Sequence, residues 1–186
     1  MSPLPTLSAP EIASDRLVLR KAHDGDREGL IELQTDPEVR AYLGGPRPRG
    51  TVEQYLDAVG IANVTAGPGV YVIAAKETNL LIGTLMLNRR SADQPGHLTS
   101  DGEELELTYL LRRDAWGAGL AFEAAMAALR TAAAELPDQP VLIITQTANL
   151  RSLKLAARLG FQPVSTFEAF DAQQTLATAS LHTFKA

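Results

Sequence analysis

The chain of 186 residues is 45% hydrophobic and carries a formal net charge of −5. This length suffices for one domain with a full core, and the acidic balance disfavours a nucleic-acid partner. The absence of cysteine excludes disulfides, thiolate nucleophiles and cysteine-ligated zinc, and the three scattered histidines lack metal-ligand spacing, so we expect no metal.

Residues 1–14 form a lead rich in proline and serine, which we expect to be loosely ordered. A single domain is expected over residues 15–186. The first ten residues contain neither lysine nor arginine, so they lack the charged start of a secretion signal. No apolar run has the length needed to span a bilayer. These features favour a cytoplasmic protein without a membrane partner.

The first half of the chain is predicted to contain three strands and two helices. The strands cover residues 17–21, 70–75 and 80–88, the last two joined by a turn at 77–79. Asp24 or Asp26 caps a helix that runs to Gln34, and Thr51 caps the next helix. Residues 91–102 are polar and contain glycine and proline, which is typical of a mobile loop or a long hairpin connection.

In the second half, strands and helices alternate. The strands are predicted at residues 105–109, 141–144, 162–170 and 175–185. Residues 120–134 are rich in alanine and free of proline and glycine, which predicts a long helix. Asn149 and Gly160 have the positions of an N-cap and a C-cap around a further helix. This order of elements predicts a mixed α/β fold.

Gly117 and Gly119 join the predicted strand that carries Glu106 to the long helix. Backbone N–H groups at a helix N-terminus bind anions, so the arrangement suggests a phosphate-bearing cofactor beside a base. A Walker loop is excluded because the chain has no Gly-Lys-Ser/Thr, and the dinucleotide fingerprint is excluded because Phe122 replaces its third glycine. The alternative is that the two glycines only permit a tight turn.

Three segments together resemble the GCN5-related N-acetyltransferases (GNAT), most of all their ribosomal-protein-alanine acetyltransferase branch. They are Glu106–Leu111, Trp116–Gly119 and Asn149–Phe161, with Arg16–Arg20 and Asp36–Val39 near the start. The resemblance covers residues 15–161 and depends on the order and spacing of the motifs. It implies the GNAT fold, a twisted mixed sheet of about six to seven strands with helices on both faces.

The resemblance further implies transfer of an acetyl group from acetyl-CoA to a primary amine, either of a protein N-terminus or of a small molecule. The glycine turn would hold the pyrophosphate, and the preceding strand would align the pantetheine arm. The residues implied in binding acetyl-CoA are Tyr109, Leu110, Leu111, Arg112, Trp116, Gly117, Ala118, Gly119, Leu120, Ala121, Asn149 and Ser152.

Two catalytic roles follow from the resemblance. Glu106 has the position of a base, acting directly or through a water, which is useful because a protonated amine is not nucleophilic. Many relatives protonate the leaving thiolate with a tyrosine where this chain has Ala156, which leaves Ser152 as the nearest hydroxyl and the implied acid. The alternatives are that Glu106 is a solvated strand residue and that Ser152 only touches the cofactor.

The chain departs from the family pattern at two positions near the turn. Ala118 replaces a basic residue and Asp114 replaces glutamine or arginine, so the positive charge for the phosphates falls to Arg112, Arg113 or Arg151. These departures keep open a non-catalytic acyl-CoA-binding module on the same fold, and the glycines alone would also allow an unrelated α/β interaction domain. The expected partners are the amine acceptor and a second copy of the chain in a homodimer.

Overall fold

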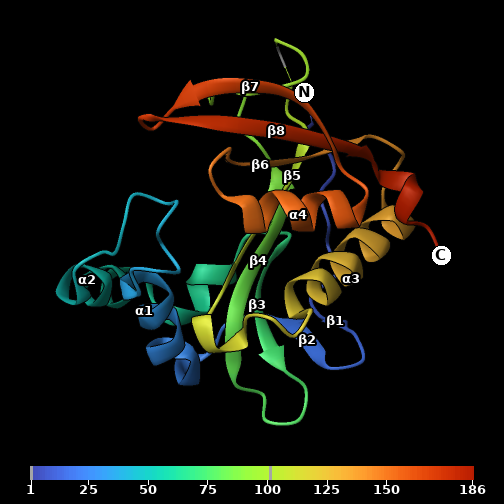
Figure 1. Cartoon of the computed structure of the whole chain (residues 1–186). Helices are drawn as coiled ribbons and strands as arrows, with labels where there is room; N and C mark the ends of the chain where they lie inside the picture. Colours follow the sequence, from blue (N-terminus) through green and yellow to red (C-terminus); the bar gives the residue numbers. More distant parts are fainter. Residues whose placement is uncertain (1, 101) are drawn as a thin grey trace.

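A single mixed sheet runs through the computed structural model, which describes residues 2–100 and 102–186 (Figure 1). Within these ranges the sheet has eight strands in the order β1-β2-β3-β4-β5-β6-β8-β7. The strands are β1 (Ile12–Ala13), β2 (Leu17–Arg20), β3 (Val70–Ala75), β4 (Leu81–Arg89), β5 (Leu105–Leu111), β6 (Pro140–Gln146), β7 (Gln162–Ala169) and β8 (Ala172–Ser180). Neighbouring strands are antiparallel except β5 and β6, which are parallel.

The sheet has eight strands, where about six to seven were predicted, because the N-terminal segment adds β1. This strand has only two residues and pairs with β2. Leu7 and Ile12 of the same segment are buried in the core beneath α3 (Leu120–Glu135). Isolated apolar residues among prolines and serines give no periodicity, so the sequence pattern does not reveal them.

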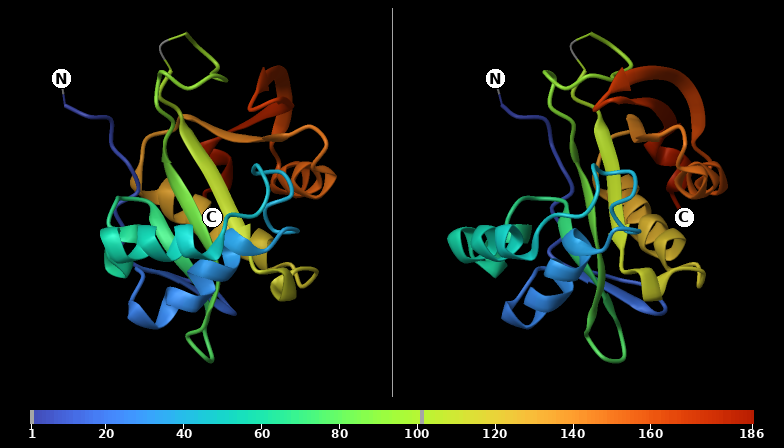
Figure 2. Two further views of the ribbon diagram at one scale, coloured as in Figure 1. Left: turned by 90° about the vertical axis from the view of Figure 1, so that its left-hand side faces the viewer. Right: turned by 60° about the vertical axis from the view of Figure 1, so that its left-hand side comes forward.

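Helices cover both faces of the sheet, as the resemblance implied. α1 (Arg27–Thr35) and α2 (Arg49–Val59) pack on one face, while α3 and α4 (Leu150–Leu159) lie on the other (Figure 2). Alternation along β3 explains the two cores. Val72 faces the cluster beneath α1 and α2, and Ile73 faces the cluster beneath α3. No helix in the described ranges is both long enough and apolar enough to cross a membrane.

The start of α2 and the capping of α1 differ from the prediction. α2 begins at Arg49 after Pro48, two residues before the predicted cap Thr51, and no side chain caps it. Asp26 is the N-cap residue of α1, as predicted, but its carboxylate accepts from Arg20 and from the His23 N–H instead of from the first turn of α1. At the start of α2, the ring of Pro48 fixes φ near a helical value, so this helix needs no polar cap.

The last predicted strand ends early. β8 stops at Ser180, and Leu181–Phe184 form a short 3-10 helix instead of continuing the strand. Leu181 and Phe184 are buried in the core cluster that contains α3. The chain turns here because these two apolar side chains, three positions apart, share one face of a 3-10 turn.

Candidate active site

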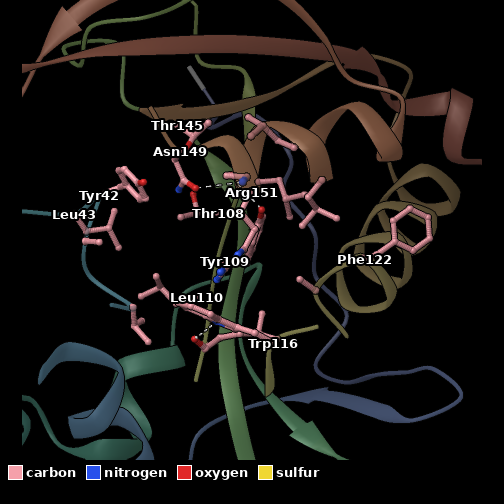
Figure 3. A pocket seen from close by; sticks show the side chains of 18 of the residues that line it. Tyr42, Leu43, Thr108, Tyr109, Leu110, Trp116, Phe122, Thr145, Asn149 and Arg151 are labelled. Carbon is pink, nitrogen blue, oxygen red and sulfur yellow. Dashed lines mark hydrogen bonds between the residues drawn. The ribbon is translucent and has the colours of Figure 1, made fainter. Parts of the chain in front are cut away.

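The strands β5 and β6 form a wedge. Their parallel pairing covers only two positions, the second being Glu106 with Leu142. Beyond it, β5 stays on β4 as far as Leu111, and β6 stays on β8 as far as Gln146, so β5 and β6 diverge. A cavity of about 520 Å³ lies in the opening (Figure 3). It is at the carboxyl ends of the two parallel strands, where open α/β sheets bind ligands.

Beyond Glu106, none of the described strands pairs with β5 on the side of the wedge. The N–H of Arg112 donates to the carbonyl of Ile82 on the β4 side, 2.8 Å away. Backbone groups alternate in direction along an antiparallel ladder, so those of Tyr109 and Leu111 point away from β4 and toward the cavity. The Leu111 carbonyl accepts from the Trp116 indole at 3.1 Å. The Tyr109 amide and the Leu111 N–H are therefore available to an extended ligand, which can add to this edge as a strand does.

The glycine turn leads directly from this edge to the start of α3. Gly117 and Gly119 have φ values of 84° and 75°, a left-handed conformation that other residues rarely adopt. Gly119 is the N-cap of α3, and no side chain caps the helix, so its first N–H groups are open to a ligand. Leu120 and Ala121 line the cavity, whereas Ala118 does not. This turn suits an anion that approaches the backbone closely.

Two arginines on α4 bring positive charge to the cavity. The Arg151 guanidinium stacks on the Trp116 ring, 3.7 Å from its centroid, and Arg158 stacks on Phe122 at 4.2 Å. Both arginines line the cavity. The sequence reasoning named Arg151 and missed Arg158. The seven-residue spacing, two turns of one helix face, is the signal that could have found it.

Arg112 and Arg113, the other two arginines suggested for the phosphates, are directed elsewhere. Arg112 pairs with Glu32 at 2.9 Å, and Arg113 pairs with Glu38 at 2.7 Å. Neither arginine lines the cavity. Of the three candidates, the structure brings only Arg151 to the site.

Two hydroxyls meet across the wedge. The Tyr109 hydroxyl from β5 and Ser152 Oγ from α4 lie 3.2 Å apart. Asn149 is the N-cap of α4, as predicted, and its Oδ1 accepts from the Ser152 N–H at 3.3 Å. Burial raises the pKa of Tyr109, and the hydrogen bond with Ser152 offsets part of that rise. Ala156, one turn further along α4, is buried and supplies no hydroxyl.

Glu106 lies at the closed end of the wedge and does not line the cavity. Its Oε2 accepts from Arg90 at 2.8 Å, and both side chains are mostly buried. Arg90 also donates to the carbonyls of Pro95 and Gly96 in the loop after β4. The structure thus holds Glu106 in an ion pair outside the cavity lining, whereas the other predicted catalytic residue, Ser152, lines the cavity.

The opposite wall of the cavity is formed by residues from three parts of the chain. It contains Tyr42 and Leu43 from the α1–α2 loop, Thr145 and Gln146 from the end of β6, and Gln174 from β8. The Gln146 side chain donates to the Tyr42 carbonyl at 3.1 Å, which ties the loop to β6. Polar residues directly after the apolar run of β6 are the one sequence signal for this wall, because they end a parallel strand.

No group of three or more His, Asp or Glu side chains that could bind a metal ion occurs among residues 2–100 and 102–186. Among the described residues that line the cavity, Glu38 is the only carboxylate, and it is paired with Arg113. The side chains of Tyr42, Leu43 and Gln146 on the opposite wall are themselves uncharged.

Comparison with known proteins identifies the fold around this wedge. Residues 16–162 match the family model described as an acetyltransferase (GNAT) domain. An uncharacterized N-acetyltransferase, p20 from Bacillus licheniformis, is 29% identical over 152 residues, which cover 80% of each chain.

Solved structures agree in fold. The GNAT-family acetyltransferase from Bacillus anthracis superposes with a TM-score of 0.73 at 17% identity, covering 92% of this chain and 98% of that one. RimL, a ribosomal L7/L12 alpha-N-protein acetyltransferase solved in complex with coenzyme A, has a TM-score of 0.68 at 15% identity, with the same two coverages.

Proposed function

The chain belongs to the GNAT acetyltransferase family, and from that premise we propose that it transfers an acetyl group from acetyl-CoA to a primary amine of a protein N-terminus or a small molecule. The observation that carries this proposal is the wedge between β5 and β6, whose free backbone edge leads into an uncapped helix start. Family membership removes the unrelated interaction domain from the alternatives.

Acetyl-CoA fits the order of features along the wedge. The free backbone groups of Tyr109 and Leu111 suit the amides of the pantetheine arm, with the Asn149 side chain opposite. The N–H groups after Gly119 suit the pyrophosphate, and Arg151 and Arg158 add positive charge at the same side. The thioester would then lie near the hydroxyls of Tyr109 and Ser152.

The chemistry needs two proton movements. The amine must lose a proton as its nitrogen bonds to the acetyl carbon, and the departing sulfur must gain one. Ser152 is the candidate proton donor, because its hydroxyl lines the cavity. Glu106 is the candidate acceptor and would act through a water, because it does not line the cavity.

The amine would enter beside the uncharged wall formed by Tyr42, Leu43 and Gln146. The α1–α2 loop is fixed by the Gln146 hydrogen bond and by the pair of Arg113 with Glu38. Burying a charge without a partner is costly. This wall therefore favours acceptors whose groups next to the amine are neutral.

The second candidate function is a non-catalytic acyl-CoA-binding module. The ion pair between Glu106 and Arg90 favours it, because it occupies the carboxylate that would serve as the base. Ala118 and Asp114, which replace polar or basic family residues, are compatible with either function.

The test combines binding with turnover. Melting of the protein with and without millimolar acetyl-CoA measures binding, since a ligand at a hundred times its dissociation constant adds about 2.7 kcal/mol of stability. A panel of amines and N-terminal peptides, with detection of free thiol, measures transfer. Stabilisation with thiol release supports the enzyme, stabilisation without release supports the module, and an unchanged midpoint contradicts both.

A further inference from the structure

We propose that Tyr109 is a positioning residue that donates its phenolic proton to Ser152 Oγ and thereby makes Ser152 an effective proton donor to the departing thiolate. This inference rests on the proposed acetyl transfer. It concerns a residue that enters the sequence reasoning only as a backbone contact of the pantetheine arm.

The two hydroxyls meet because of the fold rather than the sequence. They are 43 residues apart, one on β5 and one on the first turn of α4, and their oxygens are 3.2 Å apart. Both residues line the cavity, and Figure 3 shows Tyr109 among the lining side chains. Among the described residues, Tyr109 is the only hydrogen-bond partner of Ser152 Oγ. The pair therefore stands directly between the free edge of β5 and the helix that carries Asn149.

The direction of this hydrogen bond follows from the chemistry. A serine hydroxyl has one proton, and if it donates that proton to sulfur, its oxygen needs a donor in turn. Burial raises the pKa of Tyr109, so the phenol is protonated at rest. A phenol is also more acidic than a serine hydroxyl, which makes Tyr109 the better donor of the two. The arrangement that serves catalysis is Tyr109 O–H to Ser152 Oγ, and Ser152 O–H to sulfur.

The reaction balances, and both hydroxyls are restored at its end. The C–N bond forms and the C–S bond breaks, while one amine N–H is lost and one S–H is gained. As Ser152 gives its proton to sulfur, Tyr109 gives its own to Ser152. The phenolate is then reprotonated from solvent, to which the amine proton passes by way of a water and Glu106. No serine alkoxide has to form at any stage.

Ala156 shows why such an arrangement is needed in this chain. It is buried on α4, one turn after Ser152, and has no polar atom to offer the cavity. The only phenol that the described residues bring to Ser152 comes from β5, across the wedge from α4. A merely structural pair would instead fasten α4 to β5, and the experiment must separate these two roles.

The kinetic test uses Tyr109→Phe, Ser152→Ala and the double variant. We expect Tyr109→Phe to lower kcat by about tenfold or more and to leave KM for acetyl-CoA nearly unchanged. In the Ser152→Ala background the same change should add little, because Tyr109 acts through Ser152. Losses that multiply in the double variant, or a normal kcat in Tyr109→Phe, would overturn the inference.

Two further measurements exclude a structural effect. With an acetyl thioester of an acidic aryl thiol as donor, the aryl thiolate leaves without needing a proton, so the variants should approach the wild-type rate. A persistent deficit would contradict the proton-donor role. Tyr71→Phe is the matched control, because it removes a buried phenol that donates to the Ala9 carbonyl, away from the cavity. It should keep the wild-type kcat with acetyl-CoA.

A binding measurement decides the matter even if no amine is acetylated. At alkaline pH, wild-type protein should bind CoA more tightly than desulfo-CoA, because the hydroxyl pair donates to the thiolate. Tyr109→Phe and Ser152→Ala should each reduce that preference by about tenfold, with unchanged affinity for desulfo-CoA. Equal preference in all three proteins would overturn the inference, whereas absent turnover alone would overturn only the proposed enzyme.

Discussion

Arg90 holds Glu106 in a 2.8 Å ion pair at the point where β5 leaves β6. The same guanidinium binds the carbonyls of Pro95 and Gly96, so it joins the candidate base to the loop between β4 and β5. The ion pair fixes the position of the Glu106 carboxylate, and it also engages the oxygen that would accept a proton. The role of Glu106 can be tested with two variants, one that removes proton acceptance and one that only breaks the ion pair.

Glu106→Gln keeps the shape of the side chain and removes its ability to accept a proton. If Glu106 is the base, the rate should fall about a hundredfold or more, and the deficit should shrink as pH rises and more amine is neutral. Acetyl-CoA affinity should persist. The measurement is a pH–rate profile beside Arg90→Gln, which breaks the same pair but keeps the carboxylate. Equal losses in both variants would reduce Glu106 to a structural role.

Gly119→Val should abolish acetyl-CoA binding. The left-handed backbone at Gly119 and the open N–H groups after it leave no room for a β-branched side chain beside a phosphate. Gly160→Val is the matched control, because Gly160 also has a positive φ and open surroundings but caps the far end of α4. Both variants should lose about 1–2 kcal/mol of stability to backbone strain. Calorimetry with acetyl-CoA should show lost binding in Gly119→Val only.

Arg151→Gln should raise KM for acetyl-CoA by about tenfold with little change in kcat, because a charge-assisted contact to phosphate is worth about 1.5–3 kcal/mol. The effect should fade at high salt, where ionic contacts are screened. Arg130→Gln is the control, since Arg130 is exposed on α3 and does not line the cavity. Equal KM values in wild type and Arg151→Gln at low salt would place the phosphates away from Arg151.

Protonation of Glu104 should lower the stability of the folded protein in acid. Burial alone would raise the pKa of Glu104, but hydrogen bonds from the His97 ring and from backbone N–H groups, including that of Leu98, outweigh it and hold the pKa below its usual value. A folded pKa below the unfolded one gives stability that is complete above the unfolded pKa and is lost as pH falls through the folded pKa.

The expected result is a melting temperature that falls as pH drops from about 5 to about 3, the region of an ordinary glutamate pKa and below. Glu104→Gln should flatten that part of the curve and lower the midpoint near pH 7 by about 5 °C. Glu77→Gln, in the exposed turn before β4, should leave the curve unchanged. An acid limb of the same slope in Glu104→Gln would contradict the role of this carboxylate.

Local features of the fold were predictable. Asn149 and Gly160 mark the ends of α4 as the sequence indicated, because caps act on the nearest turn of backbone. The long helix after the glycine turn was predicted for the same reason, since its alanine-rich residues favour a helix whatever surrounds them. β1 was missed because two residues are too few for a pattern.

Long-range relationships could not be predicted from local pattern. Tyr109 meets Ser152 only because β5 and β6 diverge, and nothing within either segment encodes that divergence. Arg90 meets Glu106 because of the register between β4 and β5, in which Asn88 is opposite Glu106. The sequence suggests Arg112, Arg113 and Arg151 equally for the phosphates, because it does not show that Glu32 and Glu38 pair with the first two.

The wedge has a consequence for the unliganded protein. Because β5 and β6 share only two paired positions, the sheet is nearly two sheets, one of β1 to β5 and one of β6, β8 and β7. An extended arm bound along β5 would supply the missing rung between them, so the cosubstrate would also be part of the architecture. Backbone amides of β6 and α4 should then exchange with deuterium more slowly once acetyl-CoA is bound, as two separately opening units become one.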